Sequence, residues 1–275
     1  MSSTISSTTA VIGATGKTGR RVADLLEERG VSVRRLARNT TPTFDWEQPE
    51  GWRDALDGVE RLYAAYVPDL AAPGSEEAIT RFTEIAHDAG VRHIVLLSGR
   101  GEDAARRCED ILFASGVPAT VVRASWFIQN FTEGAWRDEV LSGVLAVPAG
   151  DIREPFIDVD DIAEVAVEAL TGAGHEGRVY EVTGPSSLSF TELAALLSEI
   201  NDRDVQYVPV GFDEFHAAVA ADAGPEYATL LTELCREVFD GRNVSPTSGV
   251  LEALGRPPRD ARTVLTEAAR VGTWA

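Results

Sequence analysis

The chain has 275 residues, 44% of them hydrophobic, which is enough for one large core or for one domain with a closely packed extension. Its net charge of −19 argues against binding to nucleic acid or to an anionic membrane surface. Cys108 and Cys235 lie far apart and the four histidines form no ligand-like pair, so we expect neither a disulfide framework nor a metal site.

The chain begins with a polar segment, residues 1–9, which lacks the charged start and the apolar middle of a signal peptide. No apolar run in the sequence reaches the ~18 residues that a bilayer span requires. We therefore expect a cytoplasmic protein with no membrane partner. The sequence does not decide between a monomer and a homodimer.

Predicted strands and helices alternate through the first half of the chain. Short apolar runs predict strands, and amphipathic stretches of 10 to 15 residues predict helices between them. The strands are expected at 9–14, 31–38, 59–67, 92–98 and 118–125, and the helices at 18–30, 51–59, 74–91 and 103–117. This alternation is typical of βαβ units, so the fold class is α/β: a Rossmann-type, doubly wound parallel sheet with helices on both faces.

The pattern loosens after residue 133. A strand and a helix are expected within 153–172, a strand at 177–184, a helix at 189–200, one broken helix or two at 213–239, and a helical end at 248–271 that breaks at Pro257 and Pro258. The helix at 189–200 opens with a capping box, Ser189 and Glu192. We predict a dinucleotide-binding part at 1–133 and a smaller substrate-binding part at 134–275, packed on the first rather than forming an independent domain.

A glycine loop, "VIGATGKTG", joins the first predicted strand to the first helix. Gly13 and Gly16 leave room for a pyrophosphate to reach backbone N–H groups, and Gly19 lets the helix pack closely on the strand. The helix N-terminus then presents unpaired donors to the anion. The alternative is a tight turn between strand and helix with nothing bound.

A basic residue, Arg38, ends the second predicted strand, where an NAD-preferring site usually has Asp or Glu. Arg38 together with Lys17 in the glycine loop would suit the 2′-phosphate of NADP(H). The alternative is that Arg38 is a solvated strand end. Asp45 could accept a hydrogen bond from the adenine amine, with Phe44 or Trp46 covering the ring.

Several motifs together resemble the NmrA-like, atypical short-chain dehydrogenase/reductases, in the right order and over nearly the whole chain. They are "VIGATGKTG", "RLARN", "HIVLLS", "SGVPATVVRASWFIQNF", "PFIDVDDIAEVA" and "GRNVSPTSGVLEALGRPPRD". The resemblance implies a Rossmann domain with a small C-terminal substrate domain, and NADP(H) as cofactor. Members of this family include quinone, dye and iminium reductases, and redox-sensing regulators that bind NADP without turning it over.

The resemblance also implies roles for single residues. It assigns the phosphate loop to Gly13, Thr15, Gly16, Lys17, Thr18 and Gly19. It assigns Arg38 to the ribose phosphate, Ser98 to the place of a catalytic serine, and Asn130 to a position near the pocket.

Lys17 is the only lysine in the chain. The Tyr-x-x-x-Lys acid pair of ordinary short-chain dehydrogenases therefore cannot exist here, and the helix after "LLS" has no lysine either. The proton-donor role is empty or is filled by an unusual residue such as Glu109, Arg106 or Tyr66, each of which is more often structural.

Without a dedicated acid, hydride can still be delivered to an acceptor that is already electron-poor and delocalised, such as a quinone, an iminium ion or an enone. We expect an NADPH-dependent reductase of a small aromatic or conjugated substrate. The candidate pocket residues are Tyr66, Ser98, Trp126, Phe127, Asn130 and Phe156, although the aromatic ones could equally be core. The alternatives are a non-catalytic NADP(H)-binding redox sensor, or an isomerase or cyclase on the same fold.

Overall fold

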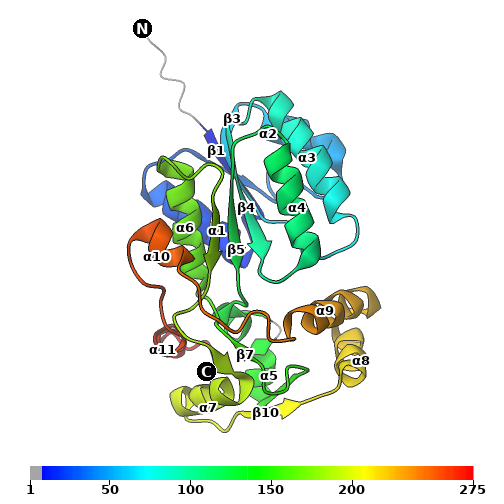
Figure 1. Ribbon diagram of the computed structural model, residues 1–275, viewed down its shortest axis with the longest axis vertical. Coiled ribbons are helices and arrows are strands. Elements are labelled where there is room, and N and C mark those ends of the chain that lie inside the picture. Colours follow the sequence, from blue (N-terminus) through cyan, green and yellow to red (C-terminus); the bar gives the residue numbers. More distant parts are fainter. Residues whose placement is uncertain (1–7, 135, 275) are drawn as a thin grey trace.

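A six-stranded, wholly parallel sheet forms the centre of the molecule in the computed structural model, which describes residues 8–134 and 136–274 (Figure 1). The spatial order is β2 (Val33–Leu36), β1 (Thr8–Ile12), β3 (Val59–Ala64), β4 (His93–Gly99), β5 (Ala119–Ala124) and β8 (Val179–Val182). β1 is thus the neighbour of the edge strand β2, and the chain continues from β2 back across β1 to β3, β4, β5 and β8 on its other side. This order brings the loops after β1, β3, β4 and β5 together at one edge.

Helices cover both faces of this sheet, as the alternating pattern predicts. One face packs on α1 (Lys17–Glu28), α6 (Val159–Thr171) and α10 (Gly249–Leu254). The other packs on α2 (Trp52–Leu56), α3 (Ser75–Ala89) and α4 (Asp103–Ala114). The Rossmann-type fold class is therefore confirmed.

A smaller layer lies against the carboxyl edge of the sheet and has a core of its own (Figure 1). Its helices are α5 (Trp136–Ser142), α7 (Phe190–Asn201), α8 (Phe212–Ala223), α9 (Pro225–Val238) and α11 (Ala261–Arg270). Two small sheets join them, β6 (Val144–Val147) with β10 (Gln206–Pro209), and β7 (Arg153–Glu154) with β9 (Leu188–Ser189). This layer closes the space above the strand ends.

Most local expectations agree with this structure. The capping box at Ser189 and Glu192 is formed, and the segment 213–239 is two helices that break at Gly224, with Pro225 opening the second. Because α6 and β8 belong to the sheet layer although they follow residue 134, the two-part division at residue 133 stays a prediction. Within the described ranges, no helix combines the length and the apolar character that crossing a membrane needs.

Candidate active site

The glycine loop connects β1 to α1, and at two of its positions only glycine fits the backbone. Gly13 has φ +77°, and a Cβ placed on Gly19 would lie 2.2 Å from the Gly13 carbonyl oxygen. Gly16 is different, because it is exposed, has ordinary backbone angles and caps the helix without any side chain. The first turn of α1 contains no acidic residue, so its free N–H groups face solvent with nothing to repel an anion.

The other predicted loop residues divide by exposure. Thr15 is exposed beside Gly16 and can reach a bound phosphate. Thr18 is buried, so its side chain is turned inward and only its backbone N–H remains for a ligand. The loop is therefore an anion site built mainly from backbone.

Arg38 follows β2 at the far edge of the sheet. Its side chain is exposed and forms no salt bridge with any residue in the described ranges, which leaves it free for a ligand phosphate. The carboxylate of Asp45 accepts hydrogen bonds from the Glu47 backbone N–H at 3.1 Å and from the Gln48 side chain, so it stabilises its own turn. Asp45 therefore stays only a prediction as an adenine partner.

The rings expected to cover the adenine do not lie on the surface. Phe44 and Trp46 are buried and pack with Trp52 and Phe82 at centroid distances of 5.1 to 6.2 Å. The apolar run around them fills the core between the sheet and α2, because burying large rings stabilises the fold more than leaving them exposed.

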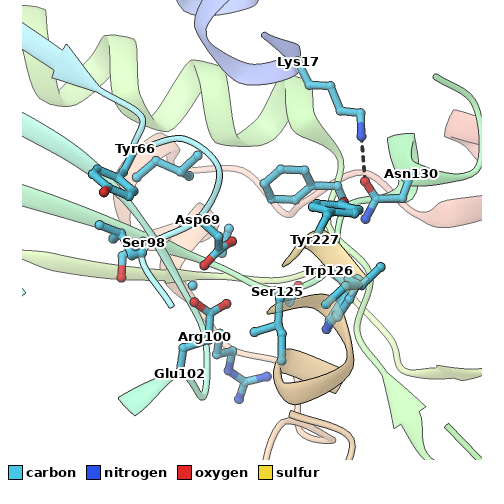
Figure 2. A pocket seen from close by; sticks show the side chains of 17 residues that line it. Lys17, Tyr66, Asp69, Ser98, Arg100, Glu102, Ser125, Trp126, Asn130 and Tyr227 are labelled. Atoms are coloured by element: carbon cyan, nitrogen blue, oxygen red, sulfur yellow. Dashed lines mark hydrogen bonds between the residues drawn. The ribbon is translucent and has the colours of Figure 1, made fainter. Parts of the chain in front are cut away.

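Lys17 points away from Arg38. Its ammonium donates a hydrogen bond to Asn130 Oδ1 at 2.8 Å, across the loop that follows β5 (Figure 2). Burial lowers the pKa of Lys17, Glu133 partly offsets this, and Arg20 and Arg21 add to the lowering. The expectation that Lys17 and Arg38 act together on one phosphate is therefore not met by this geometry, since β2 and β5 are separated by three strands.

A cavity of about 230 Å³ opens beside the loop, at the carboxyl ends of β3, β4 and β5 (Figure 2). Its walls contain five of the six predicted pocket residues: Tyr66, Ser98, Trp126, Phe127 and Asn130. Phe156 is the exception, because it is only 2% exposed and packs against Phe131 and Phe190 in the core of the smaller layer. The wall opposite the strands is completed by Tyr227, Leu231 and Leu234, all of which belong to α9.

The aromatic side chains of this cavity are held in fixed positions. Trp126 stacks between Trp136 and Phe239, each at a centroid distance of 5.2 Å. Tyr66 lies against Trp46 at 4.9 Å. Both side chains are half-buried, and this packing fixes the parts of them that line the cavity before a ligand binds.

Ser98 lines the cavity, but its hydroxyl proton is engaged. The Ser98 hydroxyl donates to Glu109 Oε1 at 2.6 Å, and Glu109 is also paired with the buried Arg123. Arg106 reaches only the outer side of Glu109, at 3.9 Å. Glu109 thus belongs to a buried ion pair behind β4, Arg106 is exposed at its outer side, and the structure does not bring either to the cavity.

Tyr66 is poorly suited to donate a proton. Burial raises the pKa of its phenol, and the negative charges of Cys108 and Glu47 raise this pKa further. An acid that holds its proton more tightly than usual, with no cation beside it, is a weak catalyst near neutral pH. The geometry thus favours a role for Tyr66 in binding.

Two acidic residues in the cavity were not foreseen. Asp69, in the loop after β3, and Glu102, the N-cap residue of α4, both line its wall (Figure 2). A signal for them existed in the sequence: each is an acidic residue that closely follows a predicted strand, and the carboxyl ends of neighbouring parallel strands meet at one edge.

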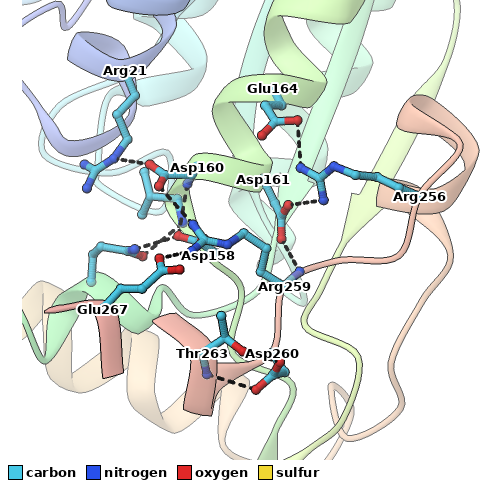
Figure 3. Close-up of polar contacts among 12 residues, drawn as sticks. Arg21, Asp158, Asp160, Asp161, Glu164, Arg256, Arg259, Asp260, Thr263 and Glu267 are labelled. Carbon is cyan, nitrogen blue, oxygen red and sulfur yellow. Dashed lines mark hydrogen bonds and ion pairs between the residues drawn. The ribbon is translucent and has the colours of Figure 1, made fainter. Parts of the chain in front are cut away.

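The loop that carries Asn130 is tied to the end of the chain through Asp158 (Figure 3). Asp158 caps α6, accepts a hydrogen bond from Gln129 Nε2 at 2.6 Å and pairs with Arg259 Nη1 at 2.8 Å. Asp161 accepts from the Arg259 backbone N–H at 2.7 Å. The "DVDDIA" motif therefore anchors the C-terminal segment and, through Gln129, the wall of the cavity.

Comparison with known proteins places these features in context. A sequence model of the NAD(P)H-binding family matches residues 13–173. The chain is 34% identical over 273 residues to a (4-alkanoyl-5-oxo-2,5-dihydrofuran-3-yl)methyl phosphate reductase of Streptomyces griseus, covering 92% of this chain and 94% of the relative. It is 30% identical over 276 residues to an NAD(P)H azoreductase of Xenophilus azovorans, covering 90% and 93%. An NADPH-dependent quinone oxidoreductase of Escherichia coli, solved with NADPH, has the same fold with a TM-score of 0.79 at 24% identity, over 94% of this chain and 99% of that one.

Proposed function

The chain belongs to the NAD(P)H-binding family, and from this premise we propose that it is an NADPH-dependent reductase that transfers hydride to a conjugated electrophile without a Tyr-Lys acid pair. Its membership agrees with the resemblance to the NmrA-like, atypical short-chain dehydrogenase/reductases. The observation that carries the proposal is the cavity beside the glycine loop, walled by packed aromatic rings in a chain whose one lysine stands on α1.

The residues present fit NADP(H). The glycine loop and the start of α1 would hold the pyrophosphate, and Arg38 would hold the 2′-phosphate. Lys17 and Asn130, at the mouth of the cavity, lie between the loop and the aromatic wall. Bound there, the cofactor supplies the hydride, and the protein supplies orientation and an apolar surface.

The shape and lining of the cavity favour a flat acceptor. Tyr66, Trp126 and Phe127 are positioned to contact a delocalised ring system rather than a small aliphatic ketone. The names of two relatives support this class, since one is a reductase of an alkanoyl-substituted oxodihydrofuran phosphate and the other is an azoreductase. The first name gives an unsaturated lactone as the compound that is reduced, and the second gives azo compounds.

Steady-state oxidation of NADPH with a panel of acceptors tests this proposal. The panel contains a quinone, an azo dye, an unsaturated lactone, an iminium ion and a simple ketone. We expect turnover with one or more of the conjugated acceptors, and at least ~100-fold less with the ketone, which offers the aromatic wall no flat, delocalised surface to bind. Tight binding of NADPH with no turnover of any acceptor would instead support the alternative of a redox sensor.

Replacing Arg38 with alanine is expected to weaken NADPH specifically. Loss of a charge-assisted bond to the 2′-phosphate should cost about 1.5–3 kcal/mol, or roughly 10- to 150-fold in Kd. NADH has no such phosphate, so its Kd should change less than ~2-fold. The matched control is Arg81→Ala, which removes an equally exposed arginine from α3. Fluorescence titration with NADPH and with NADH measures both Kd values. Equal affinity for the two cofactors in the parent protein would contradict the assignment of Arg38 to the 2′-phosphate.

A further inference from the structure

Two carboxyl groups face each other inside the cavity, Asp69 from the loop after β3 and Glu102 at the start of α4 (Figure 2). Glu102 is only 8% exposed, and its Oε2 finds no hydrogen-bond donor in the described part of the chain. A buried carboxylate oxygen without a donor is costly, whereas a protonated one can donate to the neighbouring carboxylate. The position of Asp69 beside Glu102 therefore favours a state in which one of the two carboxyl groups is protonated.

The space for the Glu102 carboxyl is provided by Gly99, the last residue of β4. A Cβ at Gly99 would lie 1.8 to 2.2 Å from the three atoms of that carboxyl group. The backbone of β4 thus leaves a gap that the carboxyl fills, directly above the strand end. Packing against Gly99 therefore fixes the position of the Glu102 carboxyl group.

The surrounding charges favour one shared proton. Burial raises the pKa of Glu102 well above its ordinary value, and the negative charges of Asp69, Glu237 and Glu109 act in the same direction. The nearest arginine on this loop, Arg100, uses its guanidinium on the backbone carbonyls of Asn243 and Ser245, at 2.6 and 2.9 Å.

The two carboxyl groups do not hold this proton equally well. The Asp69 carboxylate accepts the backbone N–H of Ala71 at 2.8 Å, which favours its charged form, while Glu102 has no comparable donor. Burial still raises the pKa of Asp69. Burial also raises the pKa of the Tyr227 phenol, which faces Asp69 from α9, and the negative charge of Asp69 raises it further. Glu102 is thus the member of the pair that carries the proton.

We propose that Glu102, paired with Asp69, is the catalytic acid of the reductase. This inference rests on the proposed function. As the acceptor takes up hydride, its terminal oxygen or nitrogen gains an electron pair; a new bond forms from that atom to hydrogen, and the O–H bond of Glu102 breaks. Glu102 is left as a carboxylate and takes a proton back from water. The sum consumes NADPH, acceptor and one proton, and yields NADP⁺ and the reduced acceptor.

The experiment compares two acceptors in the parent protein and in Glu102→Gln. Menadione, an uncharged quinone, gains negative charge on reduction, whereas N-methyl-3,4-dihydroisoquinolinium is neutralised by hydride alone. We expect Glu102→Gln to lower kcat for menadione by ~100-fold or more and for the iminium by less than ~3-fold, with the KM for NADPH unchanged. Glu139→Gln is the matched control, because burial also raises the pKa of Glu139, to about 7, yet it lies outside the cavity.

Two further variants separate catalysis from a structural role. Gly99→Ala should displace the Glu102 carboxyl and reproduce the menadione defect without changing its chemistry. Asp69→Asn removes a neighbouring negative charge, so Glu102 should lose its proton at lower pH. In the parent, menadione reduction should decline as pH rises; in Asp69→Asn this decline should shift to lower pH, and in Glu102→Gln it should vanish.

Infrared spectroscopy of the protein without NADPH provides a readout independent of turnover. The difference spectrum between the parent and Glu102→Gln should contain the carbonyl band of one protonated carboxyl near neutral pH, in addition to any band that Glu139 contributes to both proteins. Equal loss of both activities in Glu102→Gln, no loss of either, or absence of the band would overturn the proposal. A parent protein that reduces no acceptor at all would instead refute the proposed function, and the acid role with it.

Discussion

Replacing Gly16 with valine is expected to abolish NADPH binding, raising Kd by more than ~100-fold, while the protein stays folded. Gly16 is exposed and has φ −80° and ψ 176°, angles that valine adopts readily. A Cβ there would lie 3.3 Å from the Gly13 carbonyl oxygen, a contact that a small shift relieves. The two methyl groups of valine would occupy the space through which a pyrophosphate reaches the N–H groups of α1.

The neighbouring glycine supplies the contrast. A Cβ on Gly19 would lie 2.2 Å from the Gly13 carbonyl oxygen and 2.6 Å from its carbonyl carbon, and because both are backbone atoms they cannot easily move away. Gly19→Ala should therefore lower the free energy of unfolding by several kcal/mol, whereas Gly16→Val should change it by less than ~1 kcal/mol. Urea denaturation measures the free energy of unfolding of both variants, and fluorescence titration measures the Kd of Gly16→Val for NADPH. Normal NADPH binding by folded Gly16→Val would show that the loop is only a turn.

The sheet and its helices could be predicted because their signals are local. Most strands of the main sheet contain a short apolar run, and the covering helices show an apolar face, so alternation alone gives the βαβ arrangement. The smaller layer carried weaker signals. Strands β6 and β10 have four residues each and pair over a long sequence separation, so nothing in either segment marks its partner. Their pairing is decided by the tertiary packing of α5 and α7 around them.

Those residues of the site that stand in recognisable sequence motifs could be predicted. Lys17 of the glycine loop, Trp126 and Asn130 stand in recognisable segments, and together with Tyr66 they line one cavity. The direction of Lys17 could not be predicted, because a long side chain on the first turn of a helix can reach either side. The pairing of Asp69 with Glu102 was equally hidden, since it arises from two loops on adjacent strands and from the gap above Gly99.

The aspartate pair in "DVDDIA" shows why a surface motif can belong to the core. Asp158 and Asp161 are both 0% exposed, although three of the six residues of the motif are aspartates, which would suit a solvated helix start. They are buried because the segment after α10 folds back over α6 and brings Arg256 and Arg259 to them (Figure 3). Burial raises the pKa of both carboxyls, and the two arginines partly offset this.

Replacing Asp158 with alanine should therefore destabilise the protein strongly, lowering the free energy of unfolding by about 3–5 kcal/mol. The change leaves the side chain of Gln129 without its 2.6 Å acceptor, removes the N-cap of α6 and leaves Arg259 without its buried partner. Asp160→Ala is the control, because Asp160 also pairs with Arg259 but its side chain is 44% exposed, so its loss should cost less than ~1 kcal/mol. Urea denaturation of both variants measures the difference. Hydrogen exchange should also show faster opening of 256–270 in Asp158→Ala alone, and equal stability of the two variants would contradict the anchoring role.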